Sequence, residues 1–179
     1  MTTQTMRERA GAVTFRGTPM TLAGEELKAG MPAPEFTLTT VALAPLGLAE
    51  AIDNGSRSAM LIVVPSLDTP VCSTEACTFN VRSPEVPKDM AAFVVSLDLP
   101  FAQARWSKAQ NVDGIAMLSA YRSPEFGPAY GVLIKELGLL ARAVFIISKN
   151  RTIAYAKTVA EVTSEPDYDE VFAAAQKLG

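Results

Sequence analysis

The 179-residue chain contains no histidine, only two cysteines and a single tryptophan. Without histidine it has no His-based catalytic triad, no imidazole general base and no His-ligated metal site. Two cysteines without histidine are also too few ligands for a structural zinc site within one chain. The sequence therefore predicts no bound metal and directs attention to the cysteines.

Charged residues are sparse as well, at 20% of the chain, and the net charge is −3. This balance argues against nucleic acid as a partner, because phosphate binding needs a concentrated basic surface. No apolar run approaches the ~18 residues that cross a bilayer, and residues 1–9 lack the apolar core of a signal peptide. We therefore expect a cytoplasmic protein without a membrane segment, in which a cysteine pair is catalytic or redox-sensing.

Apolar segments of strand length alternate with segments of helical pattern along the chain. The length favours one domain over residues 1–179, with residues 1–12 flexible. We expect an N-terminal β-hairpin over residues 13–22, with Gly17 in its turn, and a second hairpin over residues 143–157. Buried strands are expected at residues 59–64 and 91–96, short strands at 36–38 and 115–119, and the last helix at 166–178. Together these elements predict an α/β fold with a mixed central sheet flanked by helices.

The most informative segment follows the strand at residues 59–64 and reads P-S-L-D-T-P-V-C over residues 65–72. Pro65 ends the strand because it has no N–H to donate to the sheet, and a helix is expected to begin near Val71. Cys72 then lies in the first helical turn, among unpaired N–H groups at the positive end of the helix dipole. That position favours the thiolate, which is the nucleophilic form of cysteine.

Three other side chains are interpreted from their local pattern. Asp98 precedes Pro100 and is predicted to be the N-cap of the helix that begins there. Trp106 is interpreted as a packing residue rather than a site residue. Glu75, one turn into the cysteine helix, is interpreted as a solvated side chain.

Further motifs follow in order: S-L-D-L-P-F-A-Q at residues 96–103, L-S-A-Y-R at 118–122, A-Y-G at 129–131 and A-R-A at 141–143. With the spacing of Pro65, Thr69 and Cys72, they resemble the peroxiredoxins, and most closely the bacterial thiol peroxidase subfamily. The N-terminal hairpin and the E-P-D-Y segment at residues 165–168 match as well, so the resemblance runs from about Val13 to the C-terminus.

The resemblance implies a thioredoxin-like fold, no metal or organic cofactor, and a homodimer. It implies an enzyme that reduces hydrogen peroxide and alkyl hydroperoxides through a sulfenic acid at Cys72. Thioredoxin is the electron donor that it implies.

The resemblance also assigns roles to residues around Cys72. The Arg142 guanidinium is expected to point at the sulfur and to hydrogen-bond the peroxide. The Thr69 hydroxyl is expected to position peroxide and thiolate together, and Pro65 to close one side of the pocket. The plainer interpretations are a strand terminator for Pro65, a turn residue for Thr69 and a surface charge for Arg142.

The substrate pocket is expected to take its walls from Val71, Tyr121 and Arg122, and the last two residues are also expected at a dimer contact. Phe79 is expected to add to the apolar lining. Such a lining indicates tolerance of alkyl hydroperoxides beside hydrogen peroxide.

The chain departs from the subfamily at the resolving thiol. Ser107 stands where thiol peroxidases usually place the resolving cysteine, and the only other thiol is Cys77, five residues after Cys72. This C-x4-C spacing resembles the bacterioferritin-comigratory peroxiredoxins, in which the second cysteine of that helix resolves the first. In an intact helix, however, five residues span ~7.5 Å and turn ~140°, whereas a disulfide needs Cα atoms within ~7 Å.

We therefore hypothesise that Cys77 resolves Cys72 after the first turns of the helix unwind. The alternative is that Cys77 is a small buried apolar residue and that an external thiol recycles a one-cysteine enzyme.

Two other functions would use the same cysteine. A peroxide sensor or redox-relay protein would oxidise Cys72 once and pass the oxidation to a partner. A disulfide oxidoreductase of thioredoxin type is disfavoured, because the chain has no C-x-x-C motif and because Pro65 and Thr69 fit peroxide binding.

Overall fold

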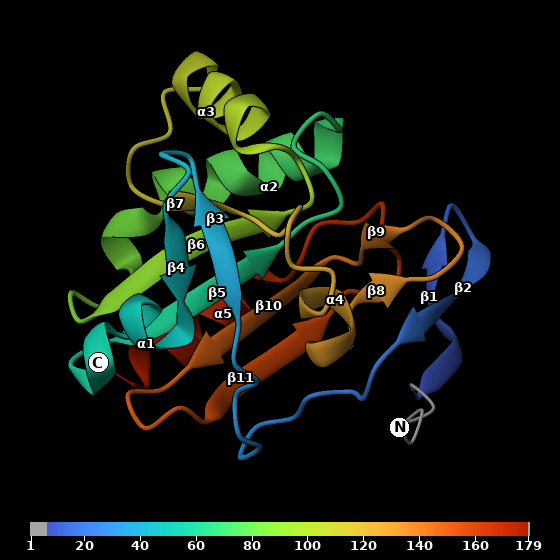
Figure 1. Ribbon diagram of the computed structural model, residues 1–179, viewed down its shortest axis with the longest axis horizontal. Helices are drawn as coiled ribbons and strands as arrows, with labels where there is room; N and C mark the ends of the chain where they lie inside the picture. Colours follow the sequence, from blue (N-terminus) through green and yellow to red (C-terminus); the bar gives the residue numbers. More distant parts are fainter. Residues whose placement is uncertain (1–6, 179) are drawn as a thin grey trace.

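The computed structural model describes residues 7–178 and contains a seven-stranded central sheet (Figure 1). The strand order is β11-β10-β5-β6-β7-β3-β4; the middle three strands run parallel, and the outer strands pair antiparallel. The strands are β3 (Thr37–Thr40), β4 (Pro45–Gly47), β5 (Ser58–Val63), β6 (Met90–Ser96), β7 (Ala116–Ser119), β10 (Ala143–Ile147) and β11 (Ile153–Thr158). The predicted α/β fold with a mixed central sheet is confirmed.

Both faces of the central sheet are covered, which accounts for the complete burial of β5. Side chains alternate across a strand, so Met60 and Ile62 pack in one core and Leu61 and Val63 in another. The core that contains Met60 and Ile62 is covered by α2 (Pro70–Val81), α3 (Pro100–Ala109) and α5 (Tyr168–Gln176). The core that contains Leu61 and Val63 is covered by α1 (Leu48–Ala51), α4 (Phe126–Ala129) and a smaller sheet. None of the helices between residues 7 and 178 combines the length and apolar character required to cross a membrane.

The smaller sheet contains the predicted N-terminal hairpin and has the order β1-β2-β8-β9. Its strands are β1 (Glu8–Phe15), β2 (Thr18–Ala23), β8 (Leu133–Ile134) and β9 (Leu139–Leu140). The two turn residues, Arg16 and Gly17, have left-handed φ values of 51° and 78°, which suit the right-handed twist of the strands. The hairpin is confirmed, but β1 begins at Glu8, so residues 8–12 of the segment expected to be flexible belong to a strand. Residues 1–6 of that segment lie outside the described residues.

The other predicted strands and the last helix are present, with ends that differ from the prediction by at most two residues. The elements that the sequence did not predict are two to four residues long: β4, α1, α4, β8, β9 and the 3₁₀ turns Asp53–Gly55 and Ser83–Glu85. Elements this short carry no hydrophobic period that can be recognised in a sequence.

Asp98 is not the N-cap of α3, contrary to the prediction. Leu99 occupies the cap position and Pro100 the first helical position. The Asp98 carboxylate instead accepts hydrogen bonds from Ser66 Oγ and from the Leu67 N–H, both at 2.8 Å. The aspartate therefore fixes the loop between β5 and α2, which leads into the cysteine helix.

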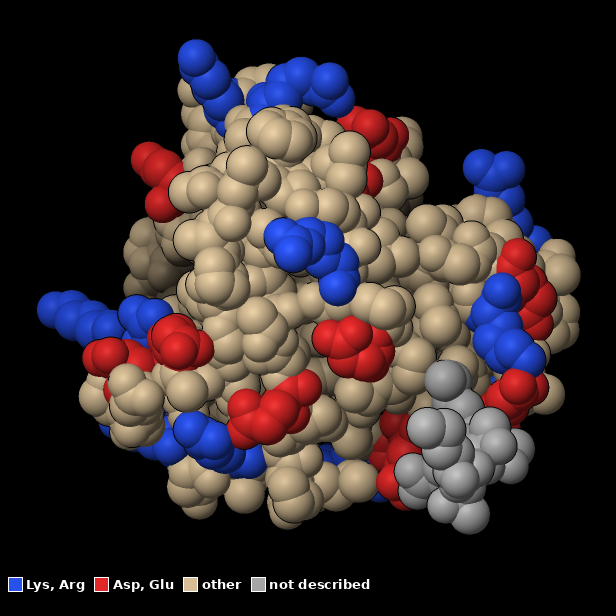
Figure 2. All heavy atoms as spheres, viewed as in Figure 1, with Lys and Arg blue, Asp and Glu red and all other residues tan. Residues whose placement is uncertain are grey.

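Charged side chains of both signs are interspersed on the surface. On the face shown in Figure 2, Lys and Arg side chains lie among Asp and Glu side chains around a broad area of uncharged residues. Some of these charges pair across the fold, as Lys149 does with Asp89, but both partners are exposed and such pairs contribute only ~0–1 kcal/mol. Burial in the two cores is therefore the main source of stability.

Candidate active site

Cys72 lies where α2 begins, beyond the carboxyl end of the buried strand β5. Thr69 is the N-cap of this helix, and its Oγ1 accepts a hydrogen bond from the Cys72 N–H at 3.4 Å. The same hydroxyl donates to the Ser66 carbonyl at 3.0 Å. With Pro70 at the first helical position, Cys72 is the third residue of the helix and is fully buried. Backbone N–H groups of the first turn lack helical partners, so this position favours negative charge on the sulfur.

Arg142 reaches the sulfur from the segment between β9 and β10, and its side chain is buried. Nη2 donates to Cys72 Sγ at 3.3 Å, Nε donates to the Val162 carbonyl at 3.1 Å, and Nη1 pairs with the Glu75 carboxylate. Burial opposes the charge, but the Glu75 carboxylate and the Cys72 sulfur outweigh it and raise the pKa of Arg142. Because each nitrogen of the planar fork has its own partner, the guanidinium is held in one orientation.

Glu75 is fully buried, so the prediction of a solvated side chain is wrong. It lies three residues after Cys72 on the same face of α2, and packing that face against Arg142 buries both side chains. Burial raises the pKa of Glu75 from 4.5 to about 7, although Arg142 acts in the opposite sense. One carboxylate oxygen pairs with Arg142, whereas Oε1 has no hydrogen-bond partner among the described residues. One buried guanidinium is thus shared between two acidic groups.

Cys72 is one of the residues that line a cavity of about 320 Å³. The predicted residues Pro65, Thr69, Val71 and Arg142 all line it. Five residues that the sequence analysis placed together, Cys72 included, are therefore neighbours in the fold. No group of three or more His, Cys, Asp or Glu side chains between residues 7 and 178 is arranged to hold a metal ion.

Four further residues of the cavity wall are not predicted from the sequence. Phe15 and Arg16 come from the tip of the N-terminal hairpin, and Val162 and Thr163 from the loop after β11. The Glu161 carboxylate joins the two segments. These contacts link residues about 145 positions apart, and no local pattern signals them.

Tyr121 and Arg122 do not line the cavity of Cys72. They follow β7, two strands away from β5 in the sheet, which corresponds to roughly 10 Å. Arg122 borders a separate hollow beside β3, and Tyr121 is 39% exposed. Phe79, also expected in the lining, packs in the core against Tyr168 and Phe172.

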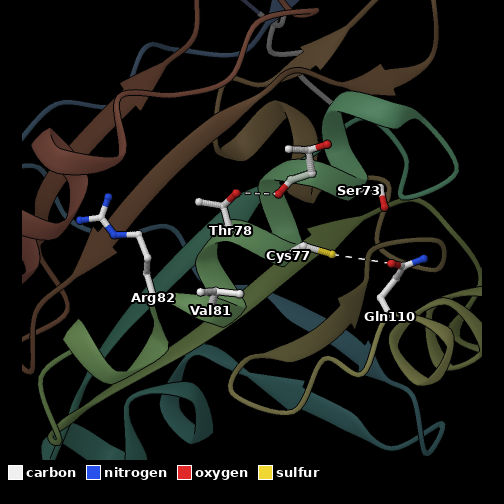
Figure 3. Close-up of a pocket in the computed structure, with 7 residues that line it drawn as sticks. Ser73, Cys77, Thr78, Val81, Arg82 and Gln110 are labelled. Atoms are coloured by element: carbon white, nitrogen blue, oxygen red, sulfur yellow. Dashed lines mark hydrogen bonds between the residues drawn. The ribbon is translucent and has the colours of Figure 1, made fainter.

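Cys77 lies on a different side of α2 from Cys72. It borders a shallow groove near the end of α3, where its sulfur lies 4.0 Å from Gln110 Oε1 (Figure 3). The side chain is partly buried, and this burial raises the pKa of the Cys77 thiol. Both cysteines are free thiols, and α2 runs without a break from Pro70 to Val81. A bond between them therefore requires the helix to open, because an unbroken helix holds the two residues too far apart.

Trp106 packs in the core over α2, which confirms its interpretation as a packing residue. Its indole N–H donates to Ser73 Oγ at 3.2 Å and so connects α3 to the beginning of α2. Ser107, the next residue, donates its hydroxyl to the Ala104 carbonyl within α3. The position where a resolving cysteine was expected thus holds a hydroxyl engaged in its own helix.

A family match, curated relatives and a solved structure all relate this chain to the same group of proteins. Residues 28–172 match the Redoxin family. The chain is 43% identical over 164 residues to a thiol peroxidase of Clostridium acetobutylicum, covering 92% of this chain and 97% of that protein. It is 42% identical over 166 residues to a thiol peroxidase of Bacillus subtilis, with 93% and 97% coverage. A solved peroxiredoxin-like protein from Aquifex aeolicus superposes with a TM-score of 0.87 at 41% identity, covering 95% of this chain and 98% of its own.

Proposed function

This chain belongs to the Redoxin family and is a thiol-dependent peroxidase with a thioredoxin-like peroxiredoxin fold, and on that premise we propose that Cys72 is the residue that attacks the peroxide. The observation that carries the proposal is the placement of its sulfur in the first turn of α2, 3.3 Å from Nη2 of the buried Arg142. The competing thiol, Cys77, borders a groove on another side of the helix. Both the helix terminus and the guanidinium favour a thiolate at residue 72.

The reaction is a displacement at oxygen. The Cys72 thiolate forms a bond to the terminal peroxide oxygen while the O–O bond breaks, and the alkoxide or hydroxide that leaves takes up one proton. The sulfur is oxidised by two electrons to a sulfenic acid, and the hydroperoxide is reduced to an alcohol or to water.

Arg142 and Thr69 are positioned to assist this step. Charge moves from the sulfur to the leaving oxygen, and the fixed Arg142 guanidinium can stabilise both ends of that transfer. The Thr69 hydroxyl donates to Ser66 and accepts from the Cys72 N–H, so one lone pair remains to accept the peroxide O–H. Pro65 forms part of the cavity wall beside Cys72.

We propose that Cys77 then resolves the sulfenic acid. Its sulfur bonds to the Cys72 sulfur, the S–OH bond breaks, and water leaves. The distance between the two residues in the intact helix requires the first turns of α2 to unwind. Partial exposure of Cys77 at the groove leaves that thiol accessible for the second step.

The test is mass spectrometry after one equivalent of hydrogen peroxide, followed by alkylation of the remaining thiols. Wild-type protein is expected to lose two hydrogens and to give a linked Cys72–Cys77 peptide. Cys77→Ser is expected to gain one oxygen at residue 72 that dimedone traps, and Cys72→Ser to remain unchanged. Peroxide-dependent oxidation in Cys72→Ser would refute the role of Cys72. A lasting oxygen adduct in the wild type would instead assign recycling to an external thiol.

We further propose that thioredoxin reduces the oxidised protein, in the cytoplasm, and that the protein is a homodimer. A disulfide is the form that thiol–disulfide exchange with thioredoxin requires. Leu99, Phe101 and Tyr121 are exposed apolar side chains near the carboxyl ends of the neighbouring strands β6 and β7, which suits an interface between copies. Oxidation of NADPH with thioredoxin and its reductase tests the first statement, and sedimentation velocity tests the dimer.

A further inference from the structure

The cavity beside Cys72 is much larger than the peroxide group requires. Its volume is about 320 Å³, whereas one water molecule occupies ~30 Å³ in the liquid. The lining is mostly apolar and includes Phe15, Pro70, Val71 and Val162. A volume near the lower limit of small-molecule pockets, ~300–1,000 Å³, suits a compact organic hydroperoxide rather than hydrogen peroxide alone.

Two arginines, Arg142 and Arg16, line this cavity. They differ in whether the N–H groups of the guanidinium have partners within the protein. Arg142 is buried and engages Cys72, Glu75 and a backbone carbonyl. Arg16 is exposed at the hairpin turn, and its guanidinium makes no hydrogen bond or ion pair with any residue between 7 and 178. The guanidinium carbon lies over the ring of Phe15, 5.5 Å from the ring centroid. The donors of Arg16 are therefore available to a ligand.

The position of Arg16 is fixed even though its side chain is exposed. The Glu161 carboxylate accepts the backbone N–H groups of Arg16 and Gly17, both at 3.0 Å, and the hydroxyls of Thr14 and Thr163. These bonds hold the hairpin tip against the loop that forms the adjacent cavity wall. They also occupy the carboxylate oxygens of Glu161, which itself does not line the cavity.

We propose that Arg16 forms a subsite for an anionic end group, so that this peroxidase recognises a compact organic hydroperoxide that carries a carboxylate remote from its O–O bond. This rests on the proposed function, with the peroxide at Cys72, the apolar body against Val71 and Phe15, and the carboxylate at Arg16. A guanidinium is the side chain best suited to this role, because its parallel N–H groups match both carboxylate oxygens.

The test compares cumene hydroperoxide bearing a para-carboxylate with the same molecule bearing a para-carboxamide. Peroxide consumption is followed under single-turnover conditions, with excess protein. The wild-type rate constant is expected to be about three- to tenfold higher for the carboxylate, and this advantage is expected to shrink as salt rises to ~0.5 M. Arg16→Gln should bring the ratio of the two rate constants to about one, and Arg16→Lys should retain part of it.

Lys88→Gln, which removes an exposed cation far along the chain from the cavity, is the matched control and should keep the wild-type ratio. Hydrogen peroxide is measured in parallel with the wild-type protein. Normal reaction with hydrogen peroxide but equal rates for the two cumene derivatives would overturn the subsite and leave the role of Cys72 intact. A ratio that persists in Arg16→Gln would overturn it as well, and absence of all three reactions would refute the proposed function instead.

Discussion

Replacement of Arg142 by methionine, in a protein that also carries Glu75→Gln, is expected to lower kcat/KM for hydroperoxides by about 10²–10³. The guanidinium is the only cation in contact with the Cys72 sulfur among the described residues. Loss of one fixed donor to a developing charge costs a factor of this size in other enzymes. The nucleophilic thiolate also loses the positive charge that stabilises it.

The second substitution is needed because Arg142 and Glu75 form a buried pair. Removal of the arginine alone leaves an uncompensated buried carboxylate, which typically costs ~3–5 kcal/mol of stability. Glu75→Gln is therefore the reference protein, and kcat/KM is compared at temperatures where circular dichroism shows both variants folded. A double variant within tenfold of this reference would reduce Arg142 to a packing residue.

Whether the sequence predicts a site residue depends on how far apart in the chain the contacting residues lie. The position of Cys72 follows from local rules, because a buried strand, a proline and a capped helix are consecutive in the chain. Pro65, Thr69 and Val71 are predicted for the same reason. Arg142, 70 residues away, was reached only through the resemblance of its A-R-A motif.

The side chains that the sequence missed depend on contacts between distant segments. Glu75 was predicted to be solvated because a carboxylate near a helix start usually is, and only the guanidinium from another segment makes its burial tolerable. Phe15 and Arg16 reach the cavity because Glu161 fixes the hairpin tip from about 145 positions away. Tyr121 was assigned to the cavity by motif, whereas the strand order places it elsewhere.

Glu75→Gln is expected to stabilise the protein at pH 8 by about 3 kcal/mol more than it does at pH 4.5. Burial raises the pKa of Glu75 to about 7 in the folded protein, from 4.5, so the folded state binds this proton more tightly than the unfolded state does. The free energy of unfolding of the wild type therefore falls as the pH rises from about 4.5 through 7. Glutamine keeps a hydrogen-bond acceptor for Arg142 and has no ionisation that burial opposes.

Urea denaturation across this pH range measures the difference, in a Cys72→Ser background that removes the other acidic group facing Arg142. Glu165 and Tyr168 interact electrostatically with Glu75 and are present in both proteins. Glu26→Gln, which removes an exposed carboxylate, is the matched control. A difference in stability that stays constant with pH would mean that Arg142 keeps Glu75 ionised throughout. If the difference from the parent protein changes with pH for Glu75→Gln but not for Glu26→Gln, the Glu75 carboxyl is largely protonated below pH 7, and under those conditions Glu75 is not an anionic partner of Arg142.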